Sequence, residues 1–150
     1  MKTRLSEQEL RAWQALLHAH HDVISLLDAE LRRDHGISLE SYDVLLRLAR
    51  ATDGALRMTE LAKRVLAAPS TLTRRVDRLV ADGLVARERL PRDSRAVEAR
   101  LTERGRSVLR RAAATHLLGI RAHFTGRLTS EQLDRVAESL EVITGPHQPH

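Results

Sequence analysis

Apolar residues recur at steps of three and four over most of the chain, which is the spacing of amphipathic helices. At the start of the chain Ser6 and Glu9 form a predicted capping box, and the helix that they open ends near Gly36. Its main apolar stripe is Leu10, Trp13, Leu17, His20, Ile24, Leu27 and Leu31. A second stripe of Leu16, Val23 and Leu26 widens this face beyond what one partner helix covers.

Three further helices are predicted from the same spacing and from residues that commonly cap helices. They run from Ser38 to Asp53-Gly54, from Thr102 to about Gly126, and from Thr129 to Gly145-Pro146. Thr129 is followed three residues later by Gln132, which makes a second capping box. Residues 146–150 are expected to form a mobile tail.

Two shorter helices are predicted between residues 58 and 83. The first is opened by Thr59 as its cap, and its apolar positions are Leu61, Ala62, Val65 and Leu66. Pro69 suits the first position of the next helix, and Asp82-Gly83 supplies the turn that ends it. Its buried positions are expected to be Leu72, Val76 and Leu79, with Val80 beside them.

The opposite face of this second short helix carries hydroxyls near its start and cations after them. The residues are Ser70, Thr71, Thr73, Arg74, Arg75 and Arg78. A helix-turn-helix needs this arrangement, because the start of its second helix enters the major groove, where hydroxyls reach base edges and arginines reach guanine or phosphate. The pattern therefore predicts a recognition helix.

A β-hairpin is predicted after Gly83. The segments 84–90 and 96–101 alternate in part between apolar and polar residues around the turn residues 91–94. The tip carries Arg92 and Arg95, and Asp93 is placed to hold a guanidinium in a fixed direction. An arginine presented in this way suits a narrow minor groove. Ala55–Arg57 is expected to add a short edge strand.

Several motifs occur in an order that resembles one family, the MarR-type winged helix-turn-helix transcriptional regulators. They are Leu61-Ala62, Ser70–Leu79 (STLTRRVDRL), Gly83–Arg87, Pro91–Arg95 and Leu101–Gly105. Ala67-Ala68 and Ser94 depart from the family, which often has a polar residue before the recognition helix and a second wing arginine. The resemblance implies a homodimer joined through N- and C-terminal helices. Such a dimer presents two recognition helices to successive major grooves and demands an inverted-repeat site.

Composition and charge agree with a DNA-binding regulator. From Arg57 to Arg111 there are 15 Lys and Arg against 7 Asp and Glu, a net charge of +8, whereas the remainder has 10 against 13, a net of −3. A basic block of this kind favours a polyanion such as double-stranded DNA. The chain has no cysteine, which excludes disulfides and a thiol switch, and neither a secretory signal nor a membrane span is visible. A cytoplasmic protein is expected.

Enzymatic and metal chemistry receive little support. No nucleophile elbow, phosphate-binding glycine loop or HExxH pair is present, so no catalytic residue is predicted. His18, His21 and Asp22 share one helix, and His116 and His123 another, so a metal-responsive regulator stays open as an alternative although no metal site is assigned. A winged helix that docks an acidic protein partner and binds no DNA is the other alternative.

The prediction is a mostly α protein with a small β-hairpin wing. Residues 1–37 and 103–145 are assigned to a helical dimerisation region and residues 38–102 to the winged helix-turn-helix. DNA contacts are expected from Ser70, Thr71, Thr73, Arg74, Arg78, Arg92, Asp93 and Arg95. No cofactor is required. The resemblance implies a small aromatic or anionic effector whose binding relieves repression. The residues expected to line its cavity are Trp13, His20, Tyr42 and His116.

Overall fold

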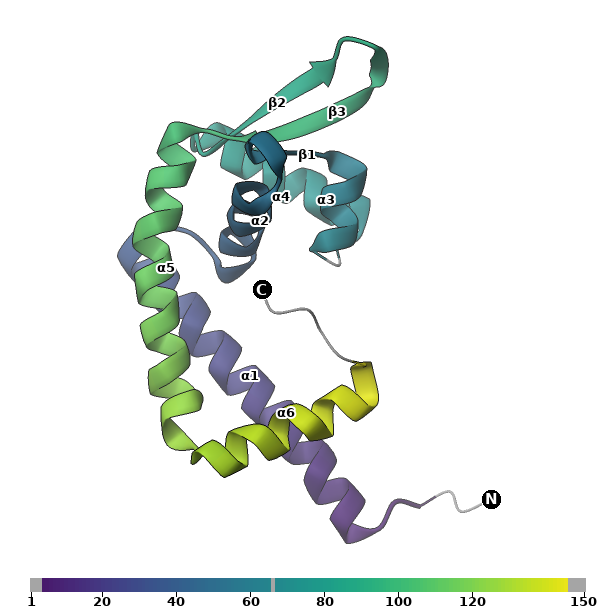
Figure 1. Cartoon of the computed structure of the whole chain (residues 1–150), viewed down its shortest axis with the longest axis vertical. Coiled ribbons are helices and arrows are strands. Elements are labelled where there is room, and N and C mark those ends of the chain that lie inside the picture. The colour runs from purple at the N-terminus through teal and green to yellow at the C-terminus, as the bar shows by residue number, and fades with distance from the viewer. Residues whose placement is uncertain (1–3, 66, 146–150) are drawn as a thin grey trace. The chain divides into compact units, whose positions relative to one another are not determined.

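The computed structural model describes residues 4–65 and 67–145 (Figure 1). The helices in this part of the chain are α1 (Glu7–His35), α2 (Leu39–Arg50), α3 (Met58–Arg64), α4 (Pro69–Ala81), α5 (Glu103–His123) and α6 (Ser130–Thr144). The strands are β1 (Ala55–Arg57), β2 (Val85–Leu90) and β3 (Asp93–Leu101). The predicted class, mostly α with a small β-hairpin wing, is confirmed. Leu66 and the predicted tail, residues 146–150, lie outside the described residues.

The chain divides into two compact units, and each is described by itself. The first, Leu27–His116, is called the winged unit here; the second combines residues 4–26 and 117–145 of the described chain and is called the terminal unit. The winged unit extends beyond the predicted winged region, 38–102, at both ends. Helices α1 and α5 each contribute residues to both units.

The hydrophobic core belongs to the winged unit. Every hydrophobic side chain that is buried in the described part of the chain falls between Leu27 and Ala112. The core joins all the helices of the unit to the sheet, with Leu31, Leu45, Leu61, Val76 and Val85 at 0–2% exposure. In the terminal unit the apolar stripes lie open instead. Exposed fractions there reach 55% for Trp13, 65% for Leu117 and 87% for Val142.

Local capping signals are confirmed at four helix starts. Ser6 and Glu9 form the predicted box, with the backbone N–H of Ser6 donating to the Glu9 carboxylate at 2.7 Å. Thr129 and Gln132 form the second box, in which each side chain accepts from the other's backbone N–H. The side chains of Ser38 and Thr102 accept from the backbone N–H groups of Ser41 and Gly105, at 3.0 and 2.9 Å. These bonds satisfy N–H groups that a helix start otherwise leaves without a partner.

Two predicted boundaries are wrong. Thr59 is not the cap of α3, because this helix already begins at Met58, directly after β1, with no side-chain cap at Arg57. Helix α2 ends at Arg50 rather than at Asp53-Gly54. A 3-10 turn at Thr52–Gly54 follows, in which Asp53 has a φ of 58°. The change of direction thus occurs through a short turn of its own and not through a longer helix.

The sheet is antiparallel with the order β1-β3-β2, so the predicted edge strand is confirmed. Arg57 lies opposite Glu98, and Val85 opposite Leu101. Strand β3 begins at Asp93, which shortens the turn to Pro91-Arg92, and the β2–β3 register shifts between Arg89 and Leu90. Figure 1 shows the β2–β3 hairpin extending beyond α3 and α4.

The start of α5 is joined to the turn that follows α4. Gly83 has a φ of 73°, the left-handed conformation that ends α4, and its carbonyl accepts from the Thr102 hydroxyl at 2.7 Å. The backbone N–H of Thr102 donates to the Leu84 carbonyl at 3.1 Å. At Gly105 a Cβ atom would lie 2.1 Å from the same carbonyl oxygen, so this close approach requires glycine.

Candidate nucleic-acid interface

Helix α4 forms because its sequence supplies both a start and a buried stripe. Pro69 occupies the first helical turn, where its missing N–H costs nothing. Ala68 at the preceding position makes no side-chain cap, as the alanine there implies. Leu72, Val76 and Leu79 are 0–1% exposed, whereas Val80 is 37% exposed and lies outside the core. The apolar contacts of the helix thus run along one side only.

The opposite side of α4 is open to solvent. Ser70, Thr73, Arg74 and Arg78 are exposed as predicted, and Thr71 is half-buried. The Thr73 hydroxyl donates to the Pro69 carbonyl at 2.9 Å, which leaves its oxygen free to accept. One residue of the predicted polar face departs from this arrangement: Arg75 turns back toward the unit, with its side chain 14% exposed and paired with Glu40 of α2 at 2.9 Å.

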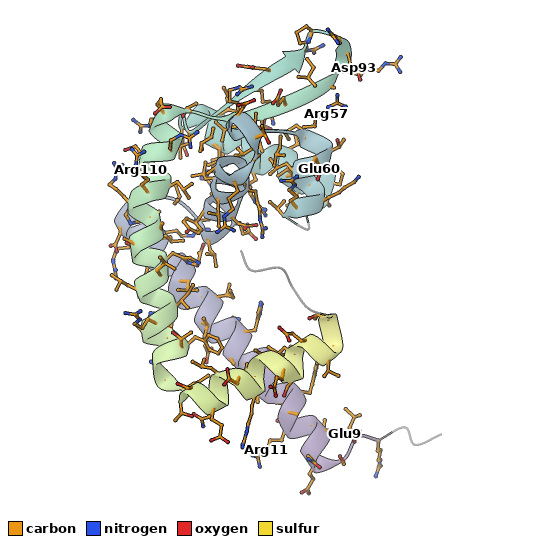
Figure 2. All side chains as sticks on the ribbon, in the orientation of Figure 1. Glu9, Arg11, Arg57, Glu60, Asp93 and Arg110 are labelled. Atoms are coloured by element: carbon orange, nitrogen blue, oxygen red, sulfur yellow. The ribbon has the colours of Figure 1, made fainter. Side chains whose placement is uncertain are left out.

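The hairpin forms the wing. Arg92, Asp93 and Arg95 are exposed at and beside its tip, and Figure 2 shows Asp93 at this end of the hairpin. The Asp93 carboxylate accepts from the backbone N–H of Arg95 at 3.1 Å. The sequence predicted that this carboxylate directs the Arg95 guanidinium. In the structure the carboxylate instead fixes the backbone two residues away, which is the geometry of an Asx turn.

A groove of about 500 Å³ connects the exposed side of α4 with the wing. Its lining residues are Arg57, Met58, Thr59, Thr73, Arg87, Asp93, Arg95, Ala96 and Val97. Thr73, Asp93 and Arg95 were predicted from the sequence, whereas Arg57, Thr59 and Arg87 were not assigned to the site. Arg57 reaches the groove because β1 pairs with β3; the edge strand was predicted from the sequence, but the place of Arg57 in the groove was not.

Tyr42 and His116, two residues of the predicted effector cavity, lie together within the winged unit. Their ring centroids are 4.7 Å apart, and the rings are tilted by 43°. Burial raises the pKa of Tyr42, and burial also lowers the pKa of His116, against the opposing effect of Asp43. The His116 Nδ1 atom is buried and has no hydrogen-bond partner among the described residues. The pair thus combines an aromatic face with one unused polar atom.

The other two predicted cavity residues belong to the terminal unit. His20 lines a groove of about 810 Å³ together with apolar residues of α1 and α6, among them Leu16, Ile24 and Leu140. Trp13 is not among the residues that line this groove, and its side chain is 55% exposed. A cavity lined by all four residues stays a prediction.

Metal ligands do not gather in the part of the chain that the structure describes. Among residues 4–65 and 67–145, no three His, Cys, Asp or Glu side chains lie close enough together to hold an ion. Within the same residues, no helix combines the length and apolar character that crossing a membrane requires.

The elements α3, α4 and the β2–β3 hairpin, in this order and with an exposed polar side on α4, define a winged helix-turn-helix protein. A model of the MarR family matches residues 35–96. A helix-turn-helix (HTH)-type transcriptional regulator of Bacillus subtilis strain 168, YkoM, is 30% identical over 118 residues, which are 79% of this chain and 74% of that protein. The HTH-type transcriptional repressor YetL of the same strain is 32% identical over 108 residues, 66% of this chain and 65% of that protein.

Solved structures agree over almost the whole chain. The MarR family regulator Sco3205 of Streptomyces coelicolor, solved in complex with DNA, is 36% identical with a TM-score of 0.89 and covers 97% of this chain and 92% of its own. AbsC, a MarR family regulator of the same organism, is 28% identical with a TM-score of 0.88 over 95% and 96% of the two chains. The chain belongs to the MarR family. It is a transcriptional regulator, which confirms the prediction that it is not an enzyme.

Proposed function

We propose that two copies of this chain bind an inverted repeat in duplex DNA and repress transcription until a small ligand binds. The observation that carries the proposal is the exposed side of α4, where Ser70, Thr73, Arg74 and Arg78 stand beside a wing tipped by Arg92 and Arg95. This surface lies within the basic part of the chain, which has a net charge of +8. The fold is that of Sco3205, which was solved with DNA.

Different residues are expected to play different parts. Ser70, Thr71, Thr73, Arg74 and Arg78 lie on the helix that enters the major groove, so some of them read bases and others bind phosphates. Arg95 enters the minor groove, where narrow regions attract arginine, and Arg92 adds a phosphate contact. Asp93 supports this arrangement by holding the backbone of Arg95.

Dimerisation is proposed to use the terminal unit. Its helices expose apolar side chains that are 40–87% accessible, including Leu17, Leu117, Leu118, Val142 and Ile143. Exposed apolar residues scattered singly are normal, but a set this dense on three helices is the mark of an interface. A two-fold dimer places its recognition helices about 34 Å apart, one turn of the duplex, which demands a symmetric operator.

The effector is proposed to be a small aromatic or anionic molecule. Tyr42 offers an aromatic face, and the buried His116 Nδ1 offers a polar atom without a partner. Such a ligand acts only if it binds one spacing of the recognition helices better than the other.

The decisive experiment is a mobility-shift titration of the purified protein on its own upstream region at two salt concentrations, followed by sequencing of the genomic fragments that it retains. Specific binding that weakens steeply with salt, and a palindromic consensus among the fragments, are expected. Repeating the titration with a chelator separates the metal-responsive alternative. A protein that retains no duplex even at low salt contradicts the proposal and favours a protein-binding winged helix.

A further inference from the structure

Helix α4 makes two ion pairs with other elements in the described part of the chain, one on each side. Arg75 pairs with Glu40 of α2 at 2.9 Å, which ties the helix to the core of the unit. Asp77 pairs with Arg87 of β2, which ties the same helix to the wing. Arg87 makes a second bond to α4, because its Nη2 donates to the Thr73 carbonyl at 3.1 Å.

The Arg87 guanidinium thus binds α4 at two points four residues apart, the Asp77 carboxylate and the Thr73 carbonyl. A guanidinium is planar and its N–H groups are fixed in direction, so two simultaneous bonds define an orientation as well as a distance. The bonds lie at the groove between α4 and the wing, which Thr73, Arg87 and Arg95 all line. Beyond this point the hairpin extends away from the helices and is held mainly by its own ladder (Figure 1).

Asp77 is an unexpected residue for this position if only charge is considered. Its side chain is 55% exposed on the helix that is to meet a polyanion, and a carboxylate near phosphates opposes binding. The basic side of the chain therefore retains an acid where electrostatics alone disfavours one. A mechanical role for the pair accounts for it, since Arg87 is 30% exposed and both its bonded groups belong to α4.

We propose that Arg87 and Asp77 form a clamp that sets the angle between the recognition helix and the wing, with Arg87 acting as a positioning residue rather than as a DNA contact. The inference rests on the proposed DNA binding. Its physical basis is that one protomer contacts the major and the minor groove at the same time with a smaller loss of conformational entropy when the angle between helix and wing is fixed beforehand.

The direction in which one substitution changes DNA affinity distinguishes the clamp from a purely electrostatic effect. Asp77→Asn removes a negative charge beside the DNA, so it tightens binding if charge alone matters. The clamp instead predicts binding that is weaker by about 3- to 10-fold. Asp82→Asn is the matched control, because Asp82 is an exposed acid at the end of the same helix whose side chain joins no ion pair among the described residues. This variant is expected to bind as tightly as the wild type or more tightly.

A double-mutant cycle separates the clamp from a direct phosphate contact by Arg87. Under the clamp, Arg87→Gln weakens binding as Asp77→Asn does, and the double variant lies within about 2-fold of the weaker single variant. If Arg87 binds phosphate, Arg87→Gln weakens DNA binding by the same factor in the wild type and in the Asp77→Asn variant. Thermal unfolding should shift by no more than about 3 °C in each variant, because exposed ion pairs contribute little stability.

A distance measurement tests the clamp without DNA. The chain has no cysteine, so Ala81→Cys and Arg92→Cys, both at exposed positions, supply two unique sites for spin labels on α4 and on the wing. Pulsed electron-spin resonance should give a broader distance distribution after Asp77→Asn or Arg87→Gln, and an unchanged one after Asp82→Asn.

Tighter DNA binding by Asp77→Asn, additive losses in the cycle, or an unchanged distance distribution each overturns the clamp. A wild-type protein that binds no duplex overturns the proposed function instead, and the spin-label distances then decide the clamp alone.

Discussion

The two units of the chain differ in what they do with their apolar residues. The winged unit buries its leucines and valines in one core, where Leu31, Leu45 and Leu48 are 0% exposed. The terminal unit has a comparable helical pattern, yet Leu117 and Leu118 remain 65% and 66% exposed. Periodicity identifies an apolar face in both units but does not reveal what covers it. The winged unit completes its core within one chain, whereas the terminal unit leaves its apolar faces exposed, which is why we propose that a second copy covers them.

The largest expected effect is on the core. Leu45→Ala removes a side chain that is 0% exposed, and the free energy of unfolding should fall by about 2–5 kcal/mol. Val80→Ala, at a 37% exposed position of α4, is the matched control, with an expected loss below about 1 kcal/mol. Denaturant titration of both variants measures the difference, and equal losses contradict the distinction between core and surface.

The next effect is on assembly. Leu117→Glu places a charge on the apolar face of the terminal unit and should raise the dimer dissociation constant by about 30-fold or more. Ala114→Glu, at an exposed position of the winged unit on the same helix, should leave it nearly unchanged. Sedimentation at several concentrations measures both constants. A Leu117→Glu dimer as tight as the wild type would place the interface elsewhere.

The winged unit should respond in its DNA preference. If Arg74 reads a base, Arg74→Ala relaxes the choice at one position of each half-site by about 1–3 kcal/mol per base pair. Competition between operator variants measures this change. A uniform loss across all sequences would show that Arg74 binds phosphate instead.

Arg95, unlike Arg74, is expected to contribute to affinity for DNA of any sequence and not to sequence preference. Arg95→Ala should weaken binding to every sequence and lower the slope of log affinity against log salt by about one phosphate equivalent. Titrations at several salt concentrations give the slope. Neither Arg74→Ala nor Arg95→Ala should change the dimer dissociation constant, because both residues lie in the winged unit.

The smallest effect concerns pH. Burial lowers the pKa of His116, so folding favours the neutral ring and the unfolded chain binds the proton more readily. Stability from this residue is present above the ordinary histidine pKa and declines as the pH falls below it. In His116→Asn this part of the pH dependence should disappear, as denaturant titrations between neutral and mildly acidic pH can test. An identical pH profile in the two proteins contradicts the assignment.

Features set by neighbours in sequence were predictable. The caps at Ser6, Ser38, Thr102 and Thr129 and the stop at Gly83 depend on residues within one helical turn, and all of them are confirmed. Thr59 failed because β1 runs directly into α3, so the helix begins at Met58, two residues before the start that a cap at Thr59 would give.

Features set by distant contacts were not predictable. Arg75 has the same local signal as Arg74, but Glu40 on α2 draws it inward. Arg87 and Arg57 enter the groove only because strands β2 and β1 lie beside their partners. The sequence predicted the exposed side of α4, apart from Arg75, and left the direction of individual arginines open.

Gly105 lies where the first turn of α5 meets the segment that follows the recognition helix. Because a single methyl group at this position would collide with the Leu84 carbonyl, the first turn of α5 packs closely against the backbone that follows the recognition helix, beside the hydrogen bond from the Thr102 hydroxyl to the Gly83 carbonyl. Backbone contacts have no rotamers with which to absorb a displacement. If an effector binds as proposed, a tilt at the beginning of α5 is therefore expected to be passed directly to the end of α4.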